Sequence, residues 1–148
     1  MERIPIVKIG KILLVPIQTD LHDQAALSLQ RDLLEKIQST SARGVLIDIS
    51  VIDIVDSFLG RVLSDTAAMA GIMNAIVVVV GIQPAVAITL VELGLDLKGI
   101  HAALNVELGL ALLRQKIGAT EKIAVGAKEK SAEPVFERIN QNGGQQTG

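Results

Sequence analysis

Two short apolar runs open the chain. They occupy residues 4–9 and 11–17 and are separated by Gly10, a pattern that predicts a β-hairpin. Pro16 lacks the amide hydrogen that a strand ladder requires. We therefore expect Pro16 to lie near the edge of the sheet or at the end of its strand.

Two further apolar runs, residues 44–50 and 75–80, are rich in β-branched residues. Runs of this length without polar alternation are typical of strands that are buried on both faces by covering helices. A weaker run at residues 97–104 predicts one more short strand.

Amphipathic stretches lie between these runs, with apolar residues recurring every three or four positions, and they predict helices. Asp20 or Asp23 is expected to cap the first helix and Asn105 the last, which Gly118 is expected to end. The expected helices cover residues 22–39, 57–73, a segment from Pro84 to Gly94, and 106–117. The apolar stripe of the second helix is expected to comprise Phe58, Leu59, Val62, Leu63, Met69, Ala70 and Met73.

After the hairpin, strands and helices alternate along the chain, which predicts an α/β fold with a mostly parallel sheet. We expect a mixed sheet of four to five strands, covered by about four helices, in a domain of residues 1–118. Residues 119–148 are polar and end in GGQQTG. They are expected to form a flexible tail.

Composition narrows the possible functions. The chain has no cysteine, and its two histidines, His22 and His101, are far apart in sequence, so no metal site, cofactor site or thiolate chemistry is expected. Its 14 basic and 16 acidic residues are intermixed and it has two phenylalanines as its aromatic residues. This pattern argues against nucleic-acid binding. No apolar run approaches the roughly 20 residues that span a bilayer, and the N-terminus lacks the apolar core of a signal peptide. We therefore expect a cytoplasmic protein with no membrane segment.

The candidate chemistry lies where the second helix is expected to begin, in the sequence DIVDSFLGRVLSD. Asp56 and Ser57 are residue types that cap helices. Alternatively, an accessible Ser57 hydroxyl is a site for phosphorylation, which adds about −1.5 to −2 charges at neutral pH. Beside Asp53 and Asp56, that charge would expel a partner while leaving the domain folded. The residue pattern alone leaves both interpretations open.

A partner that recognises Ser57 would also contact the first turns of this helix. We expect the docking surface to comprise Asp56, Phe58, Leu59 and Arg61. Phe58 either fills the core or anchors the contact, since aromatic side chains dominate binding hot spots. Leu29, at the margin of the first helix's apolar stripe, is either a self-association contact or ordinary core.

A catalytic role is not expected. Ser57 lacks the Gly-x-Ser-x-Gly setting of a hydrolase nucleophile, so the chain is not expected to be an enzyme. An alternative from another class is a small-ligand or nucleotide-binding domain that uses the turn from Gly81 to Pro84, which follows a predicted strand. The same residues, Gln83 and Pro84, also fit an ordinary helix start.

The element order, together with DIVDSFLGRVLSD (53–65) and VVVVGIQPAVAITLVELG (77–94), resembles the STAS domain of anti-sigma factor antagonists, and in particular the RsbS-type stressosome proteins. The resemblance extends over residues 4–117. It implies a STAS fold for the whole expected domain. The tail beyond Gly118 is longer than such a minimal domain requires.

The resemblance also implies a function. Such proteins assemble with RsbR-type STAS proteins into a stressosome scaffold that sequesters an RsbT-type serine kinase. Under stress the kinase phosphorylates the serine of the DSF motif, here Ser57, and is released, while a metal-dependent serine phosphatase resets the site. The resemblance thus implies a bacterial negative regulator of a stress-response cascade, non-catalytic and without a cofactor. The alternative within the same class is a simple anti-sigma factor antagonist that binds an anti-sigma kinase one to one.

Overall fold

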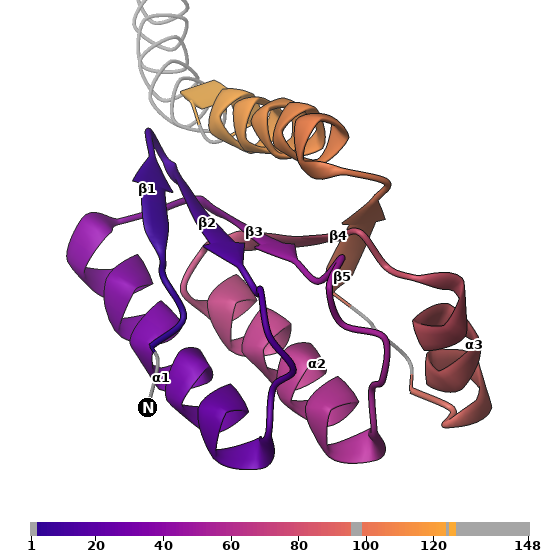
Figure 1. Cartoon of the computed structure of the whole chain (residues 1–148). Helices are drawn as coiled ribbons and strands as arrows, with labels where there is room; N and C mark the ends of the chain where they lie inside the picture. The colour runs from indigo at the N-terminus through magenta and orange to yellow at the C-terminus, as the bar shows by residue number, and fades with distance from the viewer. Residues whose placement is uncertain (1–2, 96–98, 124, 127–148) are drawn as a thin grey trace, which may run out of the picture. The chain divides into compact units, whose positions relative to one another are not determined.

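A computed structural model describes residues 3–95, 99–123 and 125–126. The chain divides into two compact units, Met1–Gln115 and Lys116–Gly148. The first unit contains a five-stranded sheet in the order β1-β2-β3-β4-β5 (Figure 1). The strands are β1 (Val7–Ile9), β2 (Ile12–Pro16), β3 (Gly44–Asp48), β4 (Ile76–Val80) and β5 (Ile100–Ala103).

The sheet is mixed, as expected. β1 pairs with β2 in antiparallel register, with Val7 opposite Leu14, and β2 to β5 are all parallel. Pro16 is the last residue of β2, which confirms its expected place at a strand end.

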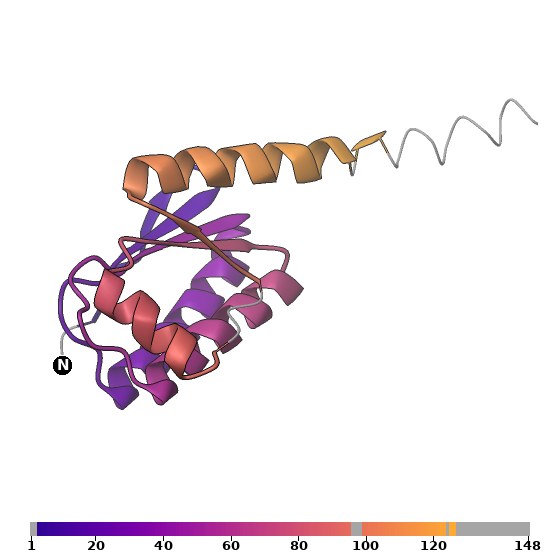
Figure 2. The same ribbon diagram turned by 90° about the vertical axis from the view of Figure 1, so that its right-hand side faces the viewer.

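The helices among the described residues are α1 (Asp23–Thr40), α2 (Ser57–Ile72), α3 (Pro84–Glu92) and a helix over residues 106–123. Helices α1 and α2 cover one face of the sheet (Figure 2). Residues 106–115 lie on the other face, where a Cβ on Gly109 would be 2.5 Å from Leu46 Cδ1 and 2.6 Å from Val80 Cγ1. Glycine is therefore needed for the helix to approach the sheet this closely.

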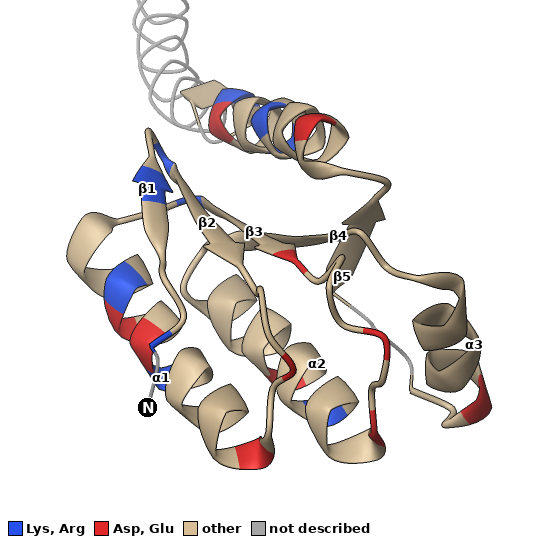
Figure 3. Ribbon diagram, in the orientation of Figure 1, with Lys and Arg blue, Asp and Glu red and all other residues tan. Residues whose placement is uncertain are grey.

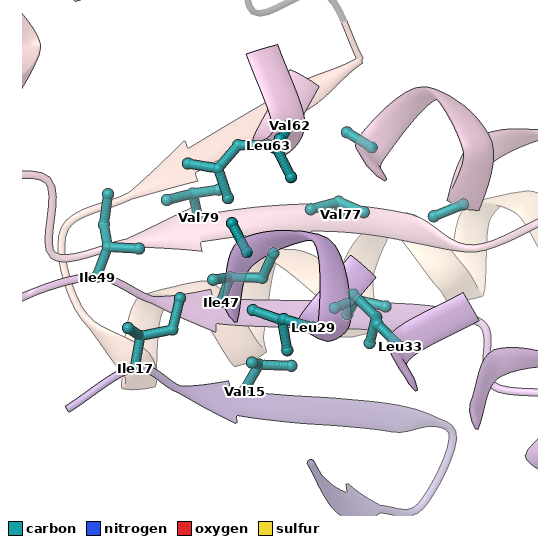
Figure 4. Close-up of a cluster of buried hydrophobic side chains, with 14 of the residues drawn as sticks. Val15, Ile17, Leu29, Leu33, Ile47, Ile49, Val62, Leu63, Val77 and Val79 are labelled. Carbon is teal, nitrogen blue, oxygen red and sulfur yellow. The ribbon is translucent and has the colours of Figure 1, made fainter. Parts of the chain in front are cut away.

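The central strands are buried on both faces. Val45, Ile47, Val77 and Val79 point into the core beneath α1 and α2 (Figure 4). Leu46, like Gly109, belongs to the opposite side. Burial on both faces explains why these strands read as continuous apolar runs rather than as an alternation.

Two expectations about helix ends were wrong. The side chain of His22, rather than that of Asp20 or Asp23, caps α1, with Nδ1 accepting a hydrogen bond from Ala25 N at 3.3 Å. The last helix does not end at Gly118 but continues through residue 123. Asn105 does cap that helix as expected, since its Oδ1 accepts from Leu108 N at 2.9 Å. Most of the expected tail, residues 127–148, lies outside the described residues.

The buried face of α2 differs from the expected stripe. Phe58, Met69 and Met73 are 37%, 40% and 36% exposed, whereas Thr66 is only 4% exposed. Thr66 Oγ1 accepts a hydrogen bond from Gln30 Nε2 of α1 at 3.0 Å and donates to Val62 O at 2.6 Å. This polar contact joins the covered side of α2 to α1. The residues of α2 that are buried are Leu59, Gly60, Val62, Leu63, Thr66, Ala67 and Ala70.

Leu29 belongs to the core. It is 7% exposed and packs with the other residues beneath the sheet (Figure 4). Its expected alternative role, as a contact on the surface, is wrong, because its position on α1 faces the sheet.

Candidate functional site

Asp56 is the residue that caps α2. It has extended backbone angles, with φ −91° and ψ 176°, and its Oδ1 accepts a hydrogen bond from Leu59 N at 2.8 Å. The Asp56 carbonyl accepts from Gly60 N at 3.0 Å and begins the helical ladder. The cap is therefore complete without the neighbouring serine.

Ser57 is the first residue of α2 and is exposed. Within the part of the chain that the structure describes, its hydroxyl makes no hydrogen bond. The Ser57 side chain is thus not needed by the helix end, and the residue is exposed at the first turn of α2.

The other residues expected on the docking surface divide into two groups. Arg61 is exposed one helical turn after Ser57, and Phe58 is 37% exposed. Leu59 is only 4% exposed and packs in the core. Its side chain is therefore not available to a partner, which corrects the expectation for that residue.

Two exposed apolar residues near Ser57 were missed by the sequence reasoning. Val51 and Ile54, in the loop between β3 and α2, are 51% and 76% exposed. Their sequence signal was an apolar stretch, VIDIV, which reads equally well as a buried continuation of the strand. Exposed apolar side chains in the loop that leads to Ser57 add apolar surface that a protein partner could contact.

Carboxylates dominate the charge near Ser57. Asp53 and Asp56 lie in the loop that precedes α2, and Arg61 is the basic residue on the first turns of the helix (Figure 3). A phosphoryl group on Ser57 would therefore add charge to a surface that is already acidic.

The loop before Ser57 is fastened to the start of α3. Gln83 Nε2 donates a hydrogen bond to Ser50 O at 2.7 Å. Gly81 has φ +76°, and a Cβ there would lie 2.7 Å from Ser50 Cβ. Both features bring the β3–α2 and β4–α3 connections into contact at the carboxyl edge of the sheet. The Gln83 amide nitrogen is thus engaged within the fold, and Pro84 begins α3.

A hollow of about 180 Å³ lies elsewhere, between residues 3–4 and α1, where it is lined by Arg3, Ser28 and Asp32 among others. Among the described residues, no group of three or more His, Asp or Glu is placed to hold a metal ion. No helix in the same part of the chain combines the length and hydropathy needed to cross a membrane.

Comparisons with known proteins agree with this geometry. Residues 3–108 match the STAS domain family. RsbS from Moorella thermoacetica, in a form in which glutamate replaces a serine, is 40% identical, covers 78% of this chain and 98% of its own, and superposes with a TM-score of 0.70. A chain from a structure of the stressosome, a signal integration and transduction hub, is 42% identical over 76% of this chain and 98% of that chain, with a TM-score of 0.67.

A more distant structure shares the fold alone. A putative anti-sigma factor antagonist from Thermotoga maritima is 13% identical, with a TM-score of 0.65, over 75% of this chain and 94% of that chain. The comparison with curated proteins gives no match. The family match over residues 3–108, the five-stranded mixed sheet and the two RsbS-like structures agree, and the chain belongs to the STAS domain family.

Proposed function

We propose that this protein is a non-catalytic stressosome scaffold that sequesters a serine kinase and releases it when Ser57 is phosphorylated. One observation carries the proposal. Asp56 alone supplies the side-chain cap of α2, which leaves the adjacent Ser57 hydroxyl exposed and without a structural task. An exposed hydroxyl that the fold does not use is accessible to another enzyme as a substrate group.

The relatives support the stressosome part of the proposal. The RsbS and stressosome chains are 40% and 42% identical and are each covered over 98% of their length. A STAS domain of this kind is a protein-binding module, so the catalytic groups are assigned to the kinase. The proposed partners are an RsbT-type kinase, RsbR-type STAS proteins and a metal-dependent serine phosphatase.

The chemical step is ordinary phosphoryl transfer. Ser57 Oγ attacks the γ-phosphorus of ATP, its proton passes to a base of the kinase, and the bond between the γ-phosphorus and the bridging oxygen breaks to release ADP. The contribution of this chain is to present the oxygen at a helix start, where nothing in the fold competes for it.

Release follows from electrostatics at the docking surface. The proposed contacts are Asp56, Phe58 and Arg61, extended by the exposed apolar residues Val51 and Ile54. A phosphoryl group in the middle of this surface brings about −1.5 to −2 charges to a contact made for a neutral hydroxyl. Juxtaposed like charges in an interface cost several kcal/mol, which exceeds a hundredfold in affinity.

The intact mass of the protein after incubation with ATP and an RsbT-type kinase tests the proposal. We expect one added phosphate in the wild type and none in Ser57→Ala. Ser50→Ala is the matched control, because Ser50 is also exposed and lies in the same connection. Phosphate on Ser57→Ala, or none on the wild type with an RsbR-type partner present, would refute the proposal.

The runner-up is an anti-sigma factor antagonist that binds one anti-sigma kinase. It shares the phosphorylated serine but predicts a one-to-one complex rather than a large particle. Sedimentation of the protein mixed with an RsbR-type STAS protein separates the two, since only a stressosome component enters a fast-sedimenting assembly.

A further inference from the structure

The hollow of about 180 Å³ between α1 and the segment before β1 has a lining that is both charged and apolar. One face of α1 forms much of it, because four lining residues follow the spacing i, i+3, i+4, i+7. These residues are Ala25, Ser28, Leu29 and Asp32. The segment before β1 contributes Ile4, which is partly buried and packs against the core. The core thus holds both sides of the hollow in place.

Two basic groups and one acidic group line the same hollow. Arg3 comes from the segment before β1, and Arg31 and Asp32 come from α1. Arg3 and Arg31 are exposed, whereas Asp32 and the Ser28 hydroxyl are half-buried. Within the described ranges, none of these four side chains forms a hydrogen bond or an ion pair. Their donors and acceptors are therefore open to a molecule that enters the hollow.

The rest of the lining is apolar and the volume is small. Sites for small molecules combine an apolar lining with a few polar groups that set the orientation of the ligand. The apolar lining residues here are Ile4, Ala25 and Leu29. The volume equals that of about six molecules of liquid water and is below the roughly 300–1,000 Å³ of a drug-sized site. The hollow therefore fits a small metabolite rather than a nucleotide.

We propose that this hollow binds a free α-amino acid with an aliphatic side chain. The carboxylate of the ligand pairs with Arg3 and Arg31, since a guanidinium group presents its donors in a planar fork that matches a carboxylate. The ammonium group of the ligand pairs with Asp32. The aliphatic side chain covers Ile4 and Leu29 and removes apolar surface from water.

A zwitterion suits the hollow better than simpler ligands do. A plain carboxylate or phosphate would meet the two guanidinium groups but would also lie near the like charge of Asp32. A plain amine would meet Asp32 but would lie near two positive charges. An uncharged apolar molecule would take water from all three groups and return no hydrogen bonds, which costs affinity. An amino acid carries both charges and an apolar part.

This site is separate from the proposed function. None of the residues that line the hollow belongs to the docking surface around Ser57. A protein that fails to bind an amino acid would still be a substrate of the kinase, and loss of phosphorylation would leave this inference untouched.

Titration of the isotope-labelled full chain with alanine, valine and leucine, followed by NMR of the backbone amides, tests the inference. We expect saturable shift changes with at least one of the three, confined to the amides of residues 3–4 and 25–32. Absence of saturable binding up to millimolar concentrations for all three would overturn the inference. Saturable changes that lie elsewhere in the chain would overturn it as well.

Two analogues test whether both charges of the ligand are read. Isocaproate is leucine without the ammonium group, and isoamylamine is leucine without the carboxylate. Each is expected to bind at least tenfold more weakly than leucine, because each loses a charged hydrogen bond. Isocaproate that binds as tightly as leucine would show that the hollow takes a simple anion, and the proposed ligand class would be wrong.

Substitutions in the protein provide the matching arm. Arg31→Gln and Asp32→Asn should each weaken binding of the tightest of the three amino acids at least tenfold. The matched controls are Arg114→Gln and Asp65→Asn, since Arg114 and Asp65 are exposed on helices and lie outside the lining. Both controls should bind as the wild type does, and circular dichroism verifies that all four variants are folded. Equal affinity in the lining variants and their controls would overturn the inference.

Discussion

Asp56 caps α2 whereas Ser57 does not, so substitutions at the two positions should change the free energy of unfolding by different amounts. Asp56→Ala removes the acceptor that lies 2.8 Å from Leu59 N and leaves that amide without its cap. Loss of an N-cap hydrogen bond costs about 1 kcal/mol, and loss of a negative charge at the positive end of a helix adds roughly 0.5 kcal/mol. We therefore expect Asp56→Ala to lower the free energy of unfolding by about 1.5 kcal/mol.

Ser57→Ala should behave differently, because the Ser57 hydroxyl makes no hydrogen bond in the described structure. Its free energy of unfolding is expected to stay within about 0.5 kcal/mol of the wild type. Any gain would come from the better helix propensity of alanine. Asp56→Asn separates the two contributions, since asparagine keeps the acceptor and loses the charge. It should cost only about 0.5 kcal/mol.

Urea unfolding followed by circular dichroism measures these differences. With a slope of about 2 kcal/mol per molar urea, Asp56→Ala should lower the midpoint by roughly 0.7 M, and Ser57→Ala should leave it unchanged. If Ser57→Ala lowers the midpoint as much as Asp56→Ala does, the hydroxyl is a structural cap. Ser57 would then have a structural task, contrary to its proposed role as the substrate of a partner enzyme.

Three further predictions concern stability and the docking surface. Gly81→Ala should lower the free energy of unfolding by about 2 kcal/mol, because it forces a side chain into φ +76° and against Ser50. Gly94→Ala, with φ +64° and open space around the Cβ, should lower it by only about 1 kcal/mol, and equal losses in urea unfolding would contradict a steric role for Ser50. Leu29→Ala should cost about 3 kcal/mol as a core truncation, while Leu27→Ala, at a 43% exposed position, should cost little, and a small loss at Leu29 would show that it is not core. Phe58→Ala should weaken kinase binding at least tenfold in calorimetry, and unchanged affinity would remove Phe58 from the docking surface.

The order of strands and helices was predictable because local patterns determine it. Five-residue strands such as β3 and β4 are buried on both faces and are composed mostly of β-branched or other apolar residues. Their shortness, their β-branched residues and the glycine or polar residues that bound them favour a buried strand over a buried helix. Pro84 likewise marks a helix start, since its fixed φ suits the first turn and its missing amide hydrogen is not needed there.

The covered side of α2 was not predictable from periodicity. When most residues of a helix are apolar or small, several stripes fit the pattern equally well. The covered side packs against α1 and the sheet and includes Thr66, which is hydrogen-bonded to Gln30. A contact between residues 36 positions apart leaves no local signal. For the same reason the periodicity predicts Phe58 and Met69, rather than Thr66, on the buried stripe.

The motif located the candidate site, but it did not show which of its two polar residues caps α2. Both Asp56 and Ser57 are good capping residues, so the sequence alone left the choice open. The choice depends on which residue has extended backbone angles, and the structure assigns these to Asp56. The contact between the β4–α3 connection and Ser50 was only weakly indicated in the sequence, by a glycine, Gly81, directly after a strand. Ser50 lies 31 residues before Gly81, so the sequence did not identify it as the residue that Gly81 and Gln83 contact.

The fold suggests how a phosphoryl group at Ser57 acts. The loop before α2 is held by the Gln83–Ser50 hydrogen bond and by the close approach of Gly81, and the start of α2 is held by Asp56. None of these contacts uses the Ser57 oxygen, so phosphorylation breaks no bond that holds the domain together. Its effect should therefore fall on a protein that touches the surface rather than on the fold. Under the proposed function, we therefore expect the phosphorylated domain to stay folded and to keep its place in the assembly while the kinase leaves.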